Sequence, residues 1–320
     1  MKKILPITIL LFAISSTVQS QSKVKLNILE VNRKASIHDF FKFTGNDIPI
    51  ISGHRGGIAP GFPENSIEAL ENTLKYTPAF FEIDPRLTKD SVIVLLHDAT
   101  MERTTTGKGK LSDYTWNQLK SIRLKDINGS ITNYRIPKLE DVINWARGKT
   151  ILNLDIKDVP PEMTANLIKK LHAEKFVMAT VHKPEQATFY YQRIPNITFS
   201  AHVKTKSSFE DYDRSGFPWN QSIAYIGPSI KPGNKEMYEL LHSKGTMCMI
   251  SSAPTYDKLN TVEERAEAYQ NVIKDGADVL ETDIPIEAAR SLTAFTEKKS
   301  DKKRFFKTKK FREYSPDDKN

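Results

Sequence analysis

The sequence predicts an α/β fold, a single (β/α)8 TIM barrel, and two observations support this prediction. Short apolar runs rich in β-branched and aromatic residues alternate with amphipathic helical patterns over most of the 320 residues, which indicates parallel strands joined by helical crossovers. About eight such repeats follow one another without a linker, and this favours a closed barrel over a doubly wound sheet. A composition of 39% hydrophobic and 27% charged residues is typical of a globular protein.

The elements follow from the order of these patterns. The expected strands cover residues 48–54, 80–88, 92–98, 150–157, 177–183, 196–203, 222–230, 246–252 and 278–285. The expected helices cover residues 65–76, 139–147, 162–174, 184–192, 234–244 and 262–275. Residues 99–138 are rich in Thr, Gly, Asn and Lys, and we expect them to form a small excursion after the second barrel strand, with one helix near residues 115–122.

The N-terminus has the pattern of a secretory signal peptide. Lys2 and Lys3 precede an apolar run from Ile4 to Ile14, and small and polar residues follow, so we expect cleavage after Ser20. A membrane anchor is the alternative, but this run has little more than half of the roughly 20 apolar residues that a span needs. Cys248 is the only cysteine, which excludes an intramolecular disulfide. We therefore expect an exported protein, periplasmic or secreted.

The net charge of +8 comes from the two ends of the chain. Residues 1–20 contribute +2 and residues 298–320 contribute +6, which leaves residues 21–297 with no net charge. This distribution gives no indication of nucleic-acid binding by the barrel. We expect an N-terminal extension at 21–47, the barrel at 48–297 and a solvated basic tail at 298–320. Weak contact of the tail with an anionic surface is the alternative.

Polar side chains end several of the predicted strands, where the chemistry of such a barrel is located. These residues are His54, Arg55, Glu82, Asp84, His97, Asp98, Asp155 and Lys157. Because side chains alternate along a strand, Glu82 and Asp84 project to the same side. Two carboxylates on one face, joined by a third from another strand, suit a hard divalent cation such as Ca²⁺ or Mg²⁺. Buried charges are costly unless paired or bound to metal, so their recurrence at strand ends indicates a functional site.

Four blocks of the sequence resemble those of the glycerophosphodiester phosphodiesterase family. They are "HRGG" followed by "PENS", "EIDPRLTKDSVIVLLHDATMERTTTGKG", "LNLDIK" and "GADVLETDIP", and together they span roughly residues 50–290. The resemblance implies a (β/α)8 barrel that hydrolyses glycerophosphodiesters, such as deacylated phospholipid head groups, to glycerol 3-phosphate and an alcohol. It also implies that His54 and His97 are the acid and base, and that Glu82, Asp84 and Asp155 hold the metal.

The chemistry of a phosphodiester gives physical reasons for these roles. Its transition state concentrates negative charge on oxygen, which calls for fixed cations, and Arg55 and Lys157 would supply them beside the metal. The leaving alkoxide needs a proton while the nucleophile loses one, and two histidines can carry out both transfers. The sequence leaves open which histidine is the acid, and whether the nucleophile is water or the neighbouring glycerol hydroxyl.

The segment after the first strand permits more than one interpretation. We expect its glycines to let the backbone approach the ligand. Glu64 and Asn65 are both candidates for the pocket, although capping of the helix that starts near Ser66 explains Asn65 equally well. We expect the run "RTTTGKG" to support His97. If Asp155 is not a ligand, the metal site would have to be redrawn around Glu64 or Glu281.

The sequence departs from the family pattern at two places. The third carboxylate is usually glutamate and is Asp155 here, which shortens its reach and could alter the metal preference. The family often has an aromatic-rich stretch where this sequence has "TMCMISSAP", so the sequence leaves the identity of the substrate's head group open. Lys204, Trp219 or Lys231 could contact the head group, and location in surface loops explains them as well. Two other functions remain: a phospholipase D-like barrel acting on intact lipids, and a phosphodiester-binding protein without turnover. The presence of both histidines favours an enzyme.

Overall fold

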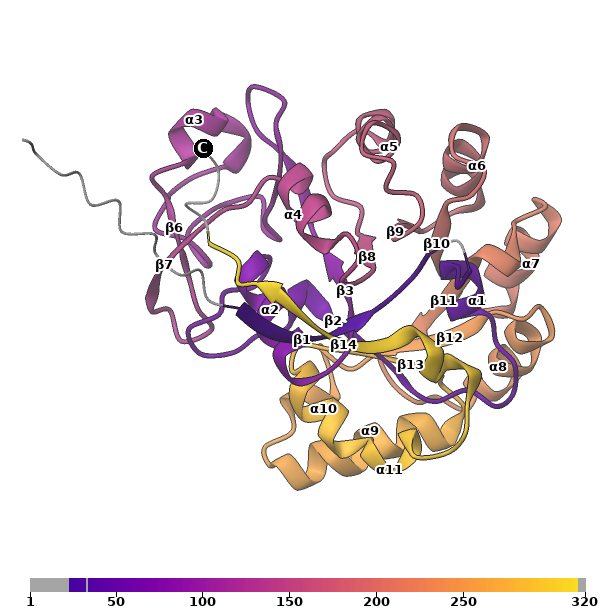
Figure 1. The fold of residues 1–320 in the computed structure, drawn as a ribbon. Coiled ribbons are helices and arrows are strands. Elements are labelled where there is room, and N and C mark those ends of the chain that lie inside the picture. The colour runs from indigo at the N-terminus through magenta and orange to yellow at the C-terminus, as the bar shows by residue number, and fades with distance from the viewer. Residues whose placement is uncertain (1–22, 33, 316–320) are drawn as a thin grey trace, which may run out of the picture.

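Eight parallel strands close into a barrel, and the helices between them cover its outer face (Figure 1). The structure is a computed structural model that describes residues 23–32 and 34–315, so the expected signal peptide lies outside the described residues. Around the barrel the order is β2, β3, β8, β9, β10, β11, β12 and β13, which confirms the predicted (β/α)8 fold. The strands are β2 (Ile50–Gly53), β3 (Phe80–Ile83), β8 (Leu152–Leu154), β9 (Val177–Val181), β10 (Thr198–His202), β11 (Ser222–Gly227), β12 (Met247–Ser251) and β13 (Val279–Thr282).

One helix follows each barrel strand. These helices are α2 (Ile67–Tyr76), α4 (Leu139–Ala146), α5 (Pro161–Lys170), α6 (Pro184–Arg193), α7 (Lys206–Arg214), α8 (Asn234–Ser243), α9 (Val262–Asp275) and α10 (Pro285–Ser291), with the short α11 (Thr293–Thr296) after them. The longest, α9, begins at a capping box between Thr261 and Glu264 and ends at Gly276, whose φ of 128° favours glycine. None of the helices in the described ranges has the length and hydropathy of a membrane span.

The strands are apolar on both faces because the barrel has two cores. In β9 the side chains of Val177, Ala179 and Val181 belong to the core between the strands and the outer helices. The alternate residue Met178 belongs to a second core inside the barrel, at the end where the strands begin. This is the pattern expected of a parallel strand that is buried on both sides.

The predicted strand at 92–98 is not part of the barrel. Its central residues form β5 (Ile93–Leu95), which pairs antiparallel with β4 (Pro85–Leu87). The predicted strand at 80–88 is correspondingly divided between β3 and β4. The two short strands are joined by a tight turn with Ser91 at φ 63°, so β5 returns to its neighbour instead of entering a parallel sheet.

The excursion therefore begins at residue 85, earlier than the sequence predicted. It also contains α3 (Trp116–Leu119) and a second hairpin formed by β6 (Arg123–Lys125) and β7 (Ile131–Arg135). The excursion has its own small core, which includes Val94, Met101 and Ile136. This core makes the excursion a defined structural unit beside the barrel mouth.

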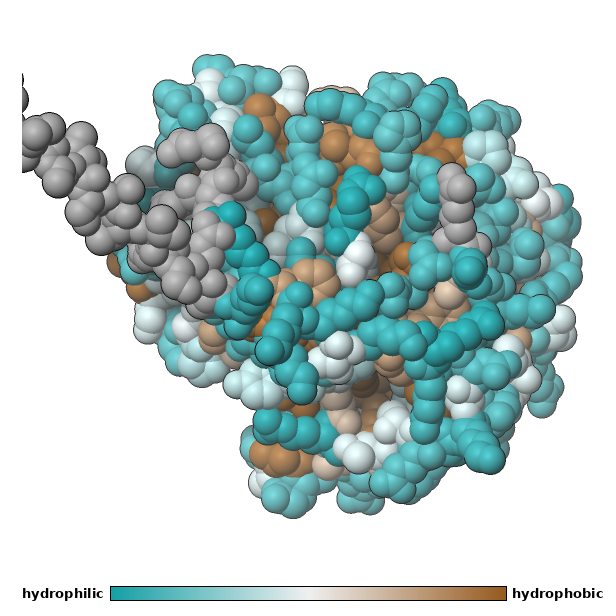
Figure 2. Space-filling model, viewed as in Figure 1, coloured by the Kyte–Doolittle hydropathy of each residue, from teal (hydrophilic) through white to brown (hydrophobic). Residues whose placement is uncertain are grey.

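The expectation of a solvated C-terminal tail is wrong for the described residues up to 315. Strand β14 (Phe306–Arg312) pairs antiparallel with β1 (Lys23–Leu29), and this β1–β14 ribbon crosses the front of the molecule in Figure 1. The ribbon's outer side carries exposed lysines and is hydrophilic in Figure 2. Its inner side is apolar, because Leu26, Ile28 and Leu29 of β1 are buried, and Phe305, which directly precedes β14, is 0% exposed. The excess of lysine in the sequence conceals this apolar component.

The ribbon and α1 (Ile37–Phe41) close the end of the barrel at which its strands begin. Phe40 and Phe305 make an edge-to-face contact with their ring centroids 5.1 Å apart. The buried ammonium of Lys302 donates to the backbone carbonyls of Asp39 and Lys42. The tail thereby joins the N-terminal extension to the barrel, and the opposite end is left open.

Candidate active site

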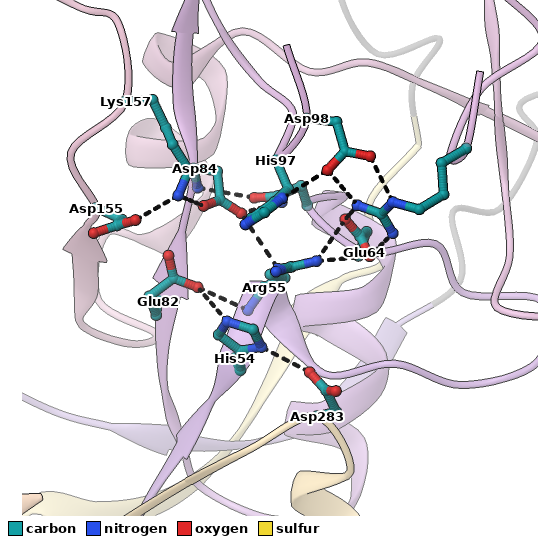
Figure 3. A network of polar contacts seen from close by, with 12 residues as sticks. His54, Arg55, Glu64, Glu82, Asp84, His97, Asp98, Asp155, Lys157 and Asp283 are labelled. Carbon is teal, nitrogen blue, oxygen red and sulfur yellow. Dashed lines mark hydrogen bonds and ion pairs between the residues drawn. The ribbon is translucent and has the colours of Figure 1, made fainter. Parts of the chain in front are cut away.

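The carboxyl ends of the barrel strands surround a cavity of about 470 Å³. Five of the residues singled out in the sequence line it, namely His54, Arg55, Glu82, Asp155 and Glu281. This is the end of a (β/α)8 barrel at which catalytic residues are found. Figure 3 shows the polar network that joins most of these residues to their neighbours.

A distorted turn after β2 places His54 and Arg55 at the mouth. Arg55 has the left-handed backbone conformation, with φ 53°, and its amide donates to Glu82 Oε2 at 3.1 Å. A left-handed conformation at a residue other than glycine is strained and is often associated with a functional site. A Cβ on Gly57 would lie 2.6 Å from the Pro285 side chain, so packing requires glycine at this position. The expectation that these glycines let the backbone approach the ligand stays a prediction.

Glu82, Asp84 and Asp155 form one cluster of carboxylates. Each offers an oxygen within 4.8 Å of the oxygens of the other two. Glu82 and Asp84 are 7% and 1% exposed. Lys157 Nζ lies between two members of the cluster, 3.0 Å from Asp84 Oδ1 and 2.6 Å from Asp155 Oδ2. A cation thus already occupies the gap between two strands' carboxylates.

The carboxylate cluster has more negative charge than the neighbouring cationic side chains balance. Burial and the neighbouring Asp84 raise the pKa of Glu82 well above its usual value. Burial also acts to raise the pKa of Asp84, but Lys157 and the hydrogen bond from Asn65 outweigh it and lower that pKa. Three hard oxygen donors with unbalanced negative charge and no sulfur ligand suit a hard divalent cation.

Asn65 is part of this site and does not cap the helix. Its Nδ2 donates to Asp84 Oδ2 at 2.7 Å, and its Oδ1 accepts from the Asp84 amide at 3.0 Å. The helix cap of α2 is instead Ser66, whose hydroxyl accepts from the Ala69 amide. The two bonds of Asn65 fix the direction of the Asp84 carboxylate.

His54 is held by a carboxylate that the sequence did not indicate as a site residue. Its Nδ1 lies 2.7 Å from Asp283 Oδ1, at the end of β13, and its Nε2 lies 3.8 Å from Glu82 Oε2. Burial acts to lower the pKa of His54, but Asp283, Glu82 and Glu281 outweigh it and raise that pKa to about 9. In the protein without metal, both ring nitrogens of His54 are therefore protonated at neutral pH, and the imidazole is positively charged. The "TD" of "GADVLETDIP" was the only signal that could have identified Asp283.

His97 reaches the mouth from the excursion, not from a barrel strand. Its Nδ1 lies 2.7 Å from Asp98 Oδ1. Arg103 donates to Asp98 and is the main cause of the lowered pKa of that carboxyl group. As predicted, the segment containing Arg103 supports His97, and the Arg86 side chain also donates to the His97 carbonyl at 2.8 Å.

Glu64 positions cationic side chains and does not join the carboxylate cluster. Arg103 donates to both of its oxygens, at 2.8 and 2.9 Å, and Arg55 Nη1 donates at 3.2 Å. Arg55 Nε has no hydrogen-bond partner among the described residues and lies 3.7 Å from Asp84 Oδ2. A buried donor without a partner at the mouth is suited to an anionic ligand.

Glu281 lies in the cavity but outside the carboxylate cluster. It is 6% exposed and accepts from Ser52 Oγ at 3.1 Å. Burial raises its pKa, and His54 acts in the opposite direction.

Trp219 was one of the residues considered for contact with the head group. It packs against Phe209 at the amino-terminal end of β11, so the prediction of head-group contact is wrong for Trp219.

Comparisons with known proteins agree with this geometry. Residues 54–208 match the family described as "Glycerophosphoryl diester phosphodiesterase family". A crystal structure of a glycerophosphoryl diester phosphodiesterase from Parabacteroides distasonis is 54% identical, with a TM-score of 0.87, and the match covers 88% of this chain and 99% of that chain.

More distant relatives match less of the sequence. A glycerophosphodiester phosphodiesterase from Caldanaerobacter subterraneus is 32% identical over 132 residues, which are 40% of this chain and about half (54%) of that protein. An Oleispira antarctica phosphodiesterase, solved with the product sn-glycerol-3-phosphate, is 18% identical and shares the fold with a TM-score of 0.58, covering 77% of this chain and 97% of that one.

Proposed function

Since the chain belongs to the glycerophosphoryl diester phosphodiesterase family and is a phosphodiesterase, we propose that it hydrolyses glycerophosphodiesters to sn-glycerol 3-phosphate and an alcohol, with one divalent cation and His54 and His97 as acid and base. One observation supports this assignment above the others. Two histidines, each fixed at Nδ1 by a carboxylate, stand beside a cluster of three carboxylates and an arginine with a free donor. Proton transfer, charge neutralisation and phosphate binding are thus provided for at one end of the barrel.

Glu82, Asp84 and Asp155 are the residues that would hold the cation, either Ca²⁺ or Mg²⁺. They fit it because their oxygens converge and because the ammonium of Lys157 already lies against two of them. When bound, a divalent cation stabilises negative charge on the phosphate oxygens. Lys157 and Arg55 remain as the cations of the chain itself that can donate to those oxygens.

The proton transfers follow from the surroundings of the two histidines. In the protein without metal, the Asp283, Glu82 and Glu281 carboxylates outweigh burial and raise the pKa of His54 to about 9. We assign His54 as the group that gives a proton to the leaving alkoxide as the P–O bond breaks. As the new P–O bond forms, His97 accepts the proton of the attacking water or glycerol hydroxyl at Nε2, because its Nδ1 is hydrogen-bonded to Asp98. Asp283 and Asp98 are positioning residues, since each acts through its histidine.

Cleavage of small diesters is better supported than action on intact lipids. The cavity is lined largely by polar side chains. Among the described residues of the excursion, the large exposed apolar side chains are Ile127 and Ile131, both on or beside the β6–β7 hairpin. Two exposed isoleucines do not form the apolar rim that lipid extraction would require.

An activity panel tests the function directly. Purified protein would be freed of metal, supplied with Ca²⁺ or Mg²⁺, and assayed for release of sn-glycerol 3-phosphate from several glycerophosphodiesters and from intact phospholipids. We expect hydrolysis of the deacylated diesters only, with loss after chelation. The replacement His172→Asn is a matched control, because His172 lies after α5 with φ 49°, a conformation that asparagine tolerates. Activity on lipids alone, or unchanged activity after chelation, would contradict the proposal.

We also propose that the protein is exported, on the basis of the N-terminal sequence pattern alone. The mature chain would begin near Gln21. N-terminal sequencing of the protein from fractionated cells checks this, and a species that retains Met1 would contradict it.

A further inference from the structure

We infer that β10, β11 and β12 form a subsite for a neutral polyol, across the barrel mouth from the phosphate site. This rests on the proposed function and adds which chemical group of the substrate is held there, and by which residues. In the closed barrel β10 stands opposite β2, β11 opposite β3 and β12 opposite β8, so these strands face the three strands that carry Arg55, Glu82 and Asp155 (Figure 1).

The first observation is a buried hydroxyl without a partner. Ser200 on β10 is 1% exposed and lines the cavity, and its Oγ makes no hydrogen bond to any described residue. A buried polar group in this state is destabilising unless something else satisfies it. The adjacent Thr180 donates its hydroxyl to Asn153 Oδ1 at 3.0 Å and makes no hydrogen bond to Ser200. The partner of Ser200 is therefore expected to come from a ligand.

The second observation is a pair of uncharged rings above this hydroxyl. The rings of His202 and Tyr225 line the same cavity with their centroids 4.7 Å apart. Burial, helped by His182 and Lys204, lowers the pKa of His202 to about 3, and burial raises the pKa of Tyr225 to about 12. Both side chains are neutral at physiological pH and can donate and accept hydrogen bonds.

The same surface is unsuited to a cationic head group. None of the lining residues contributed by β10, β11 or β12 is a carboxylate. Lys204 Nζ lies over the Tyr225 ring, 4.9 Å from its centroid, where a quaternary ammonium would otherwise bind. A neutral group with several hydroxyls fits the available donors and acceptors.

A polyol could reach this subsite from either end of the substrate. One source is the glycerol moiety that all glycerophosphodiesters share, and the other is a hydroxylated head group such as glycerol or inositol. The experiment uses Ser200→Ala and His202→Phe, which remove hydrogen bonds with little change of shape. The control is Thr198→Val, because Thr198 lies two residues earlier on the same strand and also has a buried, unpartnered hydroxyl, but does not line the cavity.

Binding is measured by calorimetry with sn-glycerol 3-phosphate and with ethyl phosphate, which has the phosphate but no hydroxyl. We expect the wild type to prefer glycerol 3-phosphate by roughly tenfold or more, and Ser200→Ala and His202→Phe each to weaken its binding by about five- to tenfold, as for loss of one hydrogen bond. Ethyl phosphate binding should change by less than about twofold, and so should all affinities of Thr198→Val.

Turnover of glycerophosphocholine and glycerophosphoinositol identifies the source of the polyol. An equal loss of kcat/KM in Ser200→Ala for both substrates assigns the subsite to the common glycerol, and a loss for glycerophosphoinositol alone assigns it to the head group. Unchanged glycerol 3-phosphate binding in both variants, together with unchanged turnover of both substrates in Ser200→Ala, would overturn the inference. Absence of wild-type turnover would overturn the proposed function instead, and the binding comparison would still decide the subsite.

Discussion

Replacing Asp283 by asparagine should lower the pKa of His54 without changing the shape of the site. Asp283 Oδ1 and His54 Nδ1 are 2.7 Å apart, and the carboxylate is one reason that the pKa of His54 is raised to about 9. A hydrogen bond to a charged partner contributes about 1.5–3 kcal/mol. At 1.36 kcal/mol per pKa unit, we expect Asp283→Asn to lower that pKa by about 1–2 units.

The same change has a consequence for stability, with a defined sign. The pKa of His54 is higher in the folded protein than its usual value of 6.5, so its protonation stabilises the fold below about pH 6.5, and this contribution is lost as the pH rises through about 9. The difference corresponds to roughly 3 kcal/mol in the metal-free protein. In Asp283→Asn the unfolding free energy should depend less on pH over this range.

NMR titration of ring-labelled histidines in the metal-free protein is the direct assay, with His54→Gln used to assign the resonance. Asp98→Asn is the matched control, because it alters the other histidine–carboxylate pair and should leave the titration of His54 unchanged. The pH dependence of kcat in the metal-loaded enzyme provides a second measurement. An unchanged His54 midpoint in Asp283→Asn would refute the reasoning.

Three further results are expected. His54→Ala and His97→Ala should each lower kcat by about 10²- to 10⁴-fold, and the double variant should be only a few-fold worse, because the pair acts as a unit; full activity in either single variant would contradict the assignment. Asp155→Ala should lose metal binding and activity together, whereas Asp155→Glu should stay active with an altered preference between Ca²⁺ and Mg²⁺, as calorimetric metal titrations would show; wild-type metal affinity in Asp155→Ala would remove it from the ligand set. Phe305→Ala should lower the free energy of unfolding by about 3–5 kcal/mol, because it leaves a cavity between the ribbon and the barrel, and the change would be seen as a lower Tm. Lys310→Ala, on the exposed side of the ribbon, should have little effect on Tm.

The sequence by itself determined the barrel and much of the candidate site. Alternating strand and helix patterns predict the parallel barrel, and the two-residue period of a strand predicts that Glu82 and Asp84 lie on one side. Strand-ending polar residues such as Asp155 are recognisable because apolar runs precede them. All of these inferences depend on local periodicity, which a single sequence contains.

The tertiary structure alone decided which distant residues meet. Asp283 lies 229 residues from its partner His54, and nothing in the local pattern around either residue indicates the contact. The pairing of β14 with β1 was likewise concealed, because the ribbon's exposed lysines dominate the composition while only a few apolar residues, such as Leu26 and Phe311, face inward. The unpartnered hydroxyl of Ser200 could be recognised only once closure of the barrel placed it against the cavity. Such contacts depend on strand order and chain crossings, and local sequence periodicity does not encode them.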